Sequence, residues 1–156
     1  SLSTSLQQGK IEKWYQAVIC GKPVDNNGTY VDYLKQDKKN NCSRIVDKSD
    51  PESKRAELEY KVLDCIQTEE KDPQYLSLVE IKLLTGRHHQ IRVQFSGHGT
   101  PLYGDGKYGN NEKAVRKSLA LCACHLKFKH PATGKIMDFQ IKPDTGAFKL
   151  FSKSND

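Results

Sequence analysis

The 156-residue sequence lacks the features that would place it in a membrane or in a secreted class. No apolar run approaches the roughly 20 residues needed to cross a bilayer. The opening residues, SLSTSLQQGK, are polar and do not form a signal peptide. The five cysteines are odd in number and irregular in spacing, which indicates reduced thiols. We therefore expect a cytoplasmic protein with no membrane partner.

Motifs for a metal, a nucleotide or a protein nucleophile are also missing. Cys122 and Cys124 fall on one face of an expected strand, but no second pair of ligands follows at zinc spacing. The glycines around residue 100 are not followed by the Gly-Lys-Ser/Thr of a phosphate loop. No Cys/His pair accompanies a nucleophile at a sharp turn between a strand and a helix. We expect buried thiols, with neither a metal nor a bound nucleotide.

What the sequence has in excess is positive charge. The net charge is +6 and the isoelectric point about 9.0, with 36% hydrophobic and 28% charged residues. This length and composition predict one globular domain with a sizeable core. A basic balance favours a polyanionic partner, with nucleic acid first, although ordinary solubility charge would explain the same total.

Residue periodicity predicts an α+β fold made mainly of strands. Residues 56–66 alternate between apolar and charged side chains, and residues 74–84 do so more loosely, which predicts an antiparallel hairpin. Further strands are expected at 13–21, 29–34, 43–46, 119–128 and 136–141, and helices at 88–97 and 111–118. The prediction is an antiparallel or mixed sheet with few helices in a domain spanning 10–143. A flexible stretch, 1–9, precedes it and a polar tail, 144–156, follows it.

One stretch, Thr85–Gly109 (TGRHHQIRVQFSGHGTPLYGDGKYG), contains two arginines, three histidines and six glycines. Thr85 is expected to help cap the helix at its start. Arg92 lies among the apolar residues of that helix, so its guanidinium needs a carboxylate or phosphate partner. That partner is either a ligand or an internal salt bridge, for instance to Asp105. Arg87 opposes the helix dipole at the start of the helix, which favours a ligand role, a phosphate first.

Together these residues resemble the RluA-type pseudouridine synthases. The stretch is similar to that family's TGR-x-HQIRVH signature, followed by its G-x-P-(hydrophobic)-x-GD-x-x-YG loop. KWYQAVICG (13–21) resembles the family's K-x-Y-x-A strand, and AELEYKVLD (56–64) resembles its A-x-T-x-Y-x-V-L strand. LALCACHLKFKHPATGK (119–135) is similar to its hairpin. The order also agrees, so the resemblance spans roughly residues 10–143.

The resemblance implies the pseudouridine synthase catalytic fold and the isomerisation of uridine in structured RNA, ribosomal or transfer, without a cofactor or metal. The base would be flipped out of its stack. Arg92 would pair with the catalytic aspartate, and Tyr15, which alone reads as a core aromatic, would lie near the target base. The remaining candidates would shape the pocket, contact RNA or build the adjoining loop: Arg87, His89, Gln90, Gly104 and Asp105.

One departure concerns the nucleophile itself. The family's catalytic aspartate lies in an H-R-L-D motif about 30 residues before the strand tyrosine, but only 14 residues precede Tyr15. No such motif occurs elsewhere, so the resemblance covers the C-terminal part of a catalytic domain that is incomplete at its N-terminus. We expect the chain to be a fragment, inactive alone. The alternatives are a nucleophile on another chain, or a non-catalytic RNA-binding module or inactive relative. The oligomeric state is not indicated.

Overall fold

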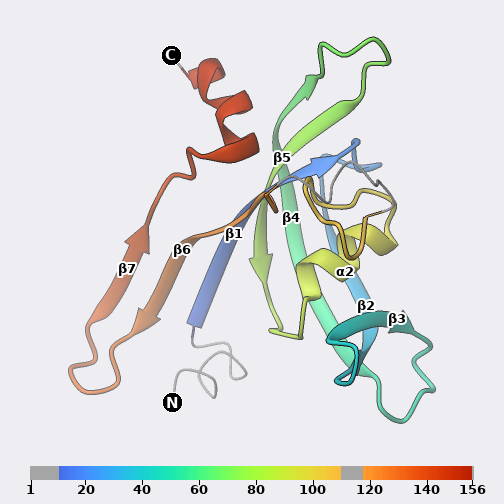
Figure 1. The fold of residues 1–156 in the computed structure, drawn as a ribbon. Coiled ribbons are helices and arrows are strands. Elements are labelled where there is room, and N and C mark those ends of the chain that lie inside the picture. Colours follow the sequence, from blue (N-terminus) through green and yellow to red (C-terminus); the bar gives the residue numbers. More distant parts are fainter. Residues whose placement is uncertain (1–10, 110–117, 156) are drawn as a thin grey trace.

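The computed structural model describes residues 11–109 and 118–155, which form one seven-stranded sheet of antiparallel neighbours (Figure 1). The strand order is β3-β2-β4-β5-β1-β6-β7. The strands are β1 (Ile11–Cys20), β2 (Asn27–Asp37), β3 (Cys42–Val46), β4 (Lys54–Gln67), β5 (Tyr75–Leu83), β6 (Leu121–Lys129) and β7 (Ile136–Gln140). The described helices are α2 (Gln90–Gly97) and a 3-10 helix, η2 (Gly146–Asn155). The predicted α+β fold, with an antiparallel sheet, is confirmed.

The alternation of apolar and charged residues along each strand determines which side chains lie on the buried face of the sheet. In β4, Leu58 and Tyr60 are buried while Glu59 and Lys61 are exposed. The expected hairpin with β5 is present, and its register places Tyr60 opposite Ile81. Because side chains directly opposite each other in a sheet share a face, the apolar residues of both strands meet on one side.

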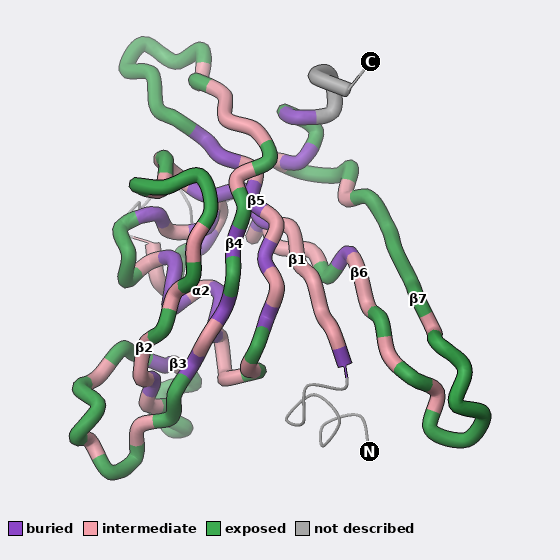
Figure 2. The backbone as a smooth tube through the Cα atoms, turned by 180° about the vertical axis from the view of Figure 1, so that it is seen from behind, coloured by how far each residue is buried: buried purple, intermediate pink, exposed green. Residues whose placement is uncertain are grey.

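The helix α2 covers that apolar side. Its Ile91 and Phe95 are four residues apart and therefore lie on one face of the helix. Both are buried in a core cluster with sheet residues such as Leu58 and Ile81. Figure 2 shows the buried segments concentrated in the central strands and in α2. The expected helix thus forms and packs through the residues that predicted it.

A second core cluster lies at the C-terminus, where the sequence predicted a polar tail. Phe148 and Phe151 in η2 are buried against Val18, Leu76 and Ala120. A 3-10 helix has three residues per turn, so two residues three apart project from the same side. Two aromatic side chains are therefore enough to attach this short helix to the sheet. Two apolar residues are too few to predict a helix from periodicity.

The β6–β7 hairpin extends away from the body of the sheet as an exposed arm (Figure 1). Its Ile136 and Phe139 are among the more exposed large apolar residues. The short basic helix expected at 111–118 falls almost wholly outside the described residues. Among the residues that the structure describes, no helix is both long and apolar enough to span a membrane.

Candidate active site

The turn that leads from β5 into α2 is held by the side chain of Gln90, which is only 3% exposed. Its Oε1 accepts hydrogen bonds from the Thr85 hydroxyl (2.8 Å) and the Arg87 backbone N–H (2.9 Å). Its Nε2 donates to the carbonyl oxygen of Glu57 in β4 (3.1 Å). The expectation that Thr85 caps the helix is wrong, because the N-cap is His89 and has no side-chain cap. Thr85 instead ties the turn to β4.

Arg92 and Asp105 form a bidentate ion pair. Arg92 Nε donates to Asp105 Oδ2 at 3.0 Å, and Nη2 donates to Oδ1 at 2.9 Å. The Asp105 side chain is 0% exposed and that of Arg92 is 20% exposed. The internal salt bridge that the sequence left open is therefore present. Pairing of Arg92 with a catalytic aspartate stays a prediction.

The electrostatics of this pair favour its charged form. Burial acts to raise the pKa of the Asp105 carboxyl, but hydrogen bonds from Arg92 and from the backbone N–H groups of Tyr108 and Lys107 outweigh it. The pKa of Asp105 therefore lies below its ordinary value. The carboxylate is ionised at neutral pH, and it fixes both the loop after α2 and the orientation of the arginine.

The loop that presents Asp105 needs glycine at position 104. Gly104 has φ +81°, in the left-handed region, and an added Cβ would collide with the carbonyl of Ser118. Gly99 also has a left-handed φ, +87°, but nothing lies within 4 Å of an added Cβ there. A side chain at either position would therefore be strained by the left-handed backbone, and at position 104 it would also collide with Ser118.

Alanine substitutions at these glycines are expected to separate strain from collision. Gly99→Ala should lower the free energy of unfolding by about 1 to 2 kcal/mol, the cost of a left-handed residue with a side chain. Gly104→Ala should cost clearly more, because the backbone at Ser118 must also shift. Urea denaturation of both variants measures the difference. Equal losses would show that the loop can move away from Ser118 without cost.

Two adjacent histidines connect α2 to the β2–β3 hairpin. The rings of His88 and His89 stack at 3.8 Å between centroids. His88 Nδ1 shares a hydrogen bond with the Ser43 hydroxyl (2.8 Å), and Nε2 shares one with Asn41 Oδ1 (3.1 Å). His89 Nδ1 shares one with the Tyr108 hydroxyl (2.7 Å). Side chains of adjacent residues usually diverge, but these two rings stack because His89 has a left-handed backbone (φ 51°).

The Tyr108 hydroxyl links His89 to the β2–β3 hairpin. It accepts a hydrogen bond from the backbone N–H of Ser43 (3.0 Å), so its own hydrogen is available to His89 Nδ1. Burial first, and then electrostatic interactions with His88 and Arg92, lower the pKa of His89. His89 is therefore neutral at neutral pH, with Nδ1 hydrogen-bonded to the Tyr108 hydroxyl. The Tyr108 ring also lies 5.0 Å from the Arg92 guanidinium carbon, which joins the histidines to the ion pair.

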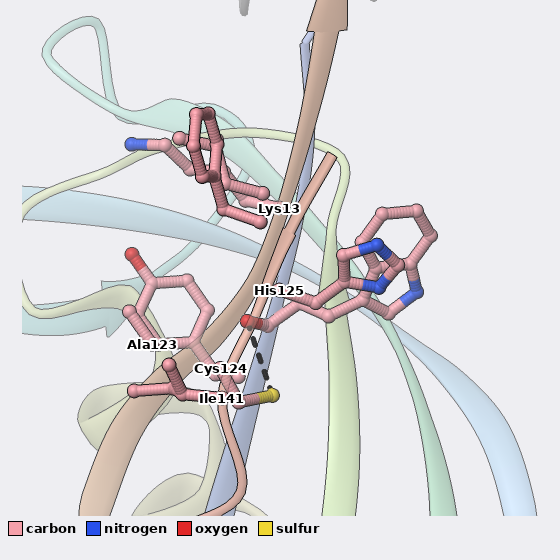
Figure 3. Close-up of a pocket in the computed structure, with 9 residues that line it drawn as sticks. Lys13, Ala123, Cys124, His125 and Ile141 are labelled. Carbon is pink, nitrogen blue, oxygen red and sulfur yellow. Dashed lines mark hydrogen bonds between the residues drawn. The ribbon is translucent and has the colours of Figure 1, made fainter. Parts of the chain in front are cut away.

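Tyr15 lies in β1 on the side of the sheet that carries α2, packed against the cluster that contains Ile91 and Phe95. Burial raises the pKa of its phenol. Tyr15 also lines an apolar hollow of about 360 Å³ with residues of β6 and β7. Figure 3 shows this hollow, with Cys124 and Ile141 among its lining residues.

The thiol of Cys124 in this hollow is inert rather than nucleophilic. Its Sγ donates a hydrogen bond to the backbone oxygen of Trp14 (3.5 Å), drawn as a dashed line in Figure 3. Burial raises the pKa of Cys124 to about 11, so it is un-ionised at neutral pH. Within the described ranges, no group of three or more His, Cys, Asp or Glu side chains could hold a metal ion.

The structure therefore brings most of the candidates together and adds others. Arg92 contacts Asp105 directly, His89 reaches them through Tyr108, and Gly104 shapes their loop. Sequence reasoning missed three side chains: Asn41, Ser43 and Tyr108. Tyr108 lies within the glycine-rich part of the stretch Thr85–Gly109. The other two come from a hairpin more than 40 positions away, and no local signal points to them.

Comparison with solved structures agrees with the fold. Human RNA Pseudouridylate Synthase Domain Containing 1 superposes with a TM-score of 0.74 at 23% identity, covering 90% of this chain and 58% of that one. At this identity the likeness concerns the architecture of the sheet and its helix. This likeness shows that the chain has the pseudouridine synthase fold.

Sequence comparison assigns the family. The family model described as RNA pseudouridylate synthase matches residues 1–97, and the chain belongs to this family. It is 35% identical to the Bacillus subtilis (strain 168) protein named Uncharacterized RNA pseudouridine synthase YlyB, over 90% of this chain and 43% of that protein. It is 33% identical to Ribosomal large subunit pseudouridine synthase D of Zymomonas mobilis subsp. mobilis, over 90% of this chain and 44% of that protein. The chain spans less than half the length of these relatives.

Proposed function

We propose that the protein isomerises uridine to pseudouridine in RNA, with the nucleophilic aspartate supplied from outside these 156 residues. The match to the family model over residues 1–97 is the observation that supports this most strongly. None of the chain's own aspartates lies in the R-(L/I)-D context of the family's nucleophile. The name of one relative, Ribosomal large subunit pseudouridine synthase D, favours ribosomal RNA of the large subunit as the substrate, with transfer RNA as the alternative. The reaction would take place in the cytoplasm.

The proposed reaction exchanges one bond for another. The aspartate attacks the nucleotide, the bond between the sugar and the base nitrogen breaks, and the base turns. Carbon 5 of the base then bonds to the sugar carbon, which releases the aspartate. Carbon 5 loses its hydrogen as a proton, and the base nitrogen that left the sugar gains one. No oxidant, cofactor or metal is needed, because the product is an isomer of the substrate.

Arg92 and Tyr15 are the residues that we propose for the chemistry. Arg92 uses Nε and Nη2 for Asp105, and a guanidinium has five N–H donors in all, so another carboxylate can bind its Nη1 side. In this proposal Asp105 holds the arginine, and the arginine orients the catalytic aspartate. Tyr15 contributes a protonated phenol and a ring beside the target base.

Of the other candidate residues, some are proposed to contact the RNA and one to support the structure of the site. Arg87 Nε donates to the Arg55 backbone oxygen (2.8 Å), which leaves its terminal nitrogens for a phosphate. His89, neutral and half-buried, presents its Nε2 edge to RNA. Gln90 shapes the turn rather than touching a ligand, because its amide is occupied by protein partners.

Tritium release from RNA carrying tritium at carbon 5 of uridine tests the proposed function. The full-length protein is expected to release tritium in proportion to the pseudouridine formed. The 156-residue chain alone is expected to release none, because it contains no aspartate in the family's motif. Both proteins are assayed on the same ribosomal and transfer RNA.

Two outcomes would contradict this proposal. Stoichiometric pseudouridine formation by the isolated chain would show that its own aspartates suffice. RNA binding by the full-length protein without tritium release from either RNA would favour the non-catalytic RNA-binding module. The second outcome would be accepted only if the RNA used in the assay is unmodified at uridine.

A further inference from the structure

A groove of about 970 Å³ runs between the β2–β3 hairpin and the turn that enters α2. The hairpin forms one wall, Lys54 at the start of β4 lies along it, and residues 86–88 form the other wall. Five cations and a histidine are among the lining residues: Lys35, Lys38, Arg44, Lys54, Arg87 and His88. The groove therefore adjoins the candidate active site and is strongly basic.

The acidic residues of the groove are already engaged. The Asp37 carboxylate accepts hydrogen bonds from the backbone N–H groups of Lys39 and Asn40 and from the Asn40 side chain. Glu52 pairs with Lys35 at 3.3 Å, and Asp50 adds a second carboxylate to the same lysine. The two carboxylates of the groove lining, Asp37 and Glu52, are outnumbered by its five cations, so cations remain in excess.

Those remaining cations are unpaired within the described part of the chain. Arg44, Lys54 and Arg87 form no ion pair with a described carboxylate, in contrast to Lys35. The register also places Lys35 directly opposite Arg44 across the β2–β3 ladder. Like charges directly opposite in a sheet are destabilising, and Asp50 and Glu52 already bind the Lys35 side of this pair. An anion bound at Arg44 would act on the other side of it. The groove is thus arranged for an external polyanion.

The shape and lining of the groove indicate which part of a polyanion it takes. Among the described residues that line it there is no Phe, Tyr or Trp, and the His88 ring is already stacked on His89, so no free aromatic platform is offered to a base. Arginine and lysine are the usual partners of phosphate oxygens in nucleic acids, and such contacts position the molecule without reading its sequence. A phosphate backbone therefore fits this groove better than an unstacked base.

We propose that this groove binds the phosphate backbone of the substrate RNA beside the modified nucleotide. The inference rests on the proposed function and adds a second contact region to it. The groove and the candidate active site form one unit, because His88 hydrogen-bonds to Ser43 and Asn41 of the hairpin. Lys107, from the loop that holds Asp105, also donates to the Asn41 backbone oxygen at 2.6 Å. RNA held in the groove is therefore held in register with the site.

Charge reversal with a matched control tests the proposal. The groove variant is Arg44→Glu with Lys54→Glu, both exposed. The control is Lys129→Glu with Lys135→Glu, which makes the same change in net charge at exposed positions of the β6–β7 hairpin, at the opposite edge of the sheet. Binding of the full-length proteins to a fluorescein-labelled RNA hairpin is measured by anisotropy between about 50 and 200 mM salt.

The groove variant is expected to bind at least about tenfold more weakly at low salt, a loss of about 1.4 kcal/mol. Its slope of log affinity against log salt should fall by about one for each lost phosphate contact. The control should change far less in both quantities. Equal weakening of both variants would show that only the net charge of the protein matters, and it would overturn the proposal. Wild-type affinity in the groove variant would also overturn it.

Two further measurements distinguish RNA binding in the groove from binding of an acidic protein there, and from the proposed isomerase activity. If the groove variant keeps its affinity for RNA and loses affinity for polyglutamate, the occupant is an acidic protein and the proposal fails. Tritium release by the wild-type protein on the same RNA reports separately on the chemistry. Weakened RNA binding in the groove variant, with no turnover by the wild type, would support the groove and reject the isomerase.

Discussion

Replacing Arg92 with alanine is expected to lower the free energy of unfolding by about 3 kcal/mol. Removing one partner of a buried ion pair costs about 3 to 5 kcal/mol, because the other charge is left buried without compensation. The lower end applies here, since the Arg92 side chain is 20% exposed and two backbone N–H groups still bind Asp105. Urea denaturation at neutral pH measures the loss.

The same variant is expected to reverse the pH dependence at Asp105. In the wild type the folded-state pKa of Asp105 is lowered, so its stabilising contribution is present above the unfolded pKa and is lost as pH falls through the folded one. Without Arg92, burial becomes the dominant influence and raises the pKa of Asp105. The contribution of Asp105 in the variant should therefore fall as pH rises above the ordinary carboxyl range. The deficit relative to wild type should be smallest in acid.

An exposed ion pair provides the control. Arg55 donates to Glu57 at 2.9 Å, the same distance as the Arg92–Asp105 contact, but its side chain is 49% exposed. Arg55→Ala should cost about 0 to 1 kcal/mol. A loss of that size for Arg92→Ala, or a deficit that does not depend on pH, would contradict the view that the Arg92–Asp105 pair stabilises the loop.

Turnover in related variants distinguishes the two partners considered for Arg92. If Arg92 also orients the catalytic aspartate, Arg92→Ala should lower kcat by about 10²-fold or more, with RNA affinity nearly unchanged. Asp105→Asn, which keeps the shape of the partner, should be much milder. Equal losses of kcat in the two variants would show that Arg92 acts only through Asp105.

Much of the fold could be predicted because the signals are local. The alternation of Leu58 and Tyr60 with Glu59 and Lys61 defines a strand and its buried face without knowledge of any partner. Ile91 and Phe95 do the same for α2. Arg92 could be singled out because a cation between apolar helix residues must find a partner. Asp105 is a carboxylate that the sequence offers for this role.

The rest depends on contacts between distant segments. Nothing near Ser43 indicates that its hydroxyl meets His88, because only the register of β2, β3 and β4 brings that hairpin to α2. The left-handed backbone of His89, which stacks it on His88, is likewise unexpected for a residue other than glycine. Such features arise from tertiary packing, which overrides local preference.

Replacing Tyr15 with phenylalanine in the full-length protein is expected to lower kcat by about 10²-fold or more, the usual scale for a side chain that transfers a proton. The ring stays, so RNA affinity and folding should be nearly unchanged. Because burial raises the pKa of Tyr15 above its ordinary value of 10.0, the phenol is protonated at neutral pH and can donate but not accept a proton. Single-turnover tritium release at saturating protein measures the chemical step.

A second tyrosine of the same core cluster serves as the control. Tyr60 is buried beside the ring of Phe95, and its hydroxyl donates to the Asp25 backbone oxygen at 3.2 Å. Tyr60→Phe removes a hydroxyl from the same cluster without touching the proposed chemistry, so kcat should stay at the wild-type level. Normal kcat in Tyr15→Phe, with loss of activity only in Tyr15→Leu, would reject the proton-donor role and leave stacking as the contribution of Tyr15. A fall in kcat below pH 10 that disappears in Tyr15→Phe would contradict the raised pKa, because a donor with that pKa stays protonated throughout this range.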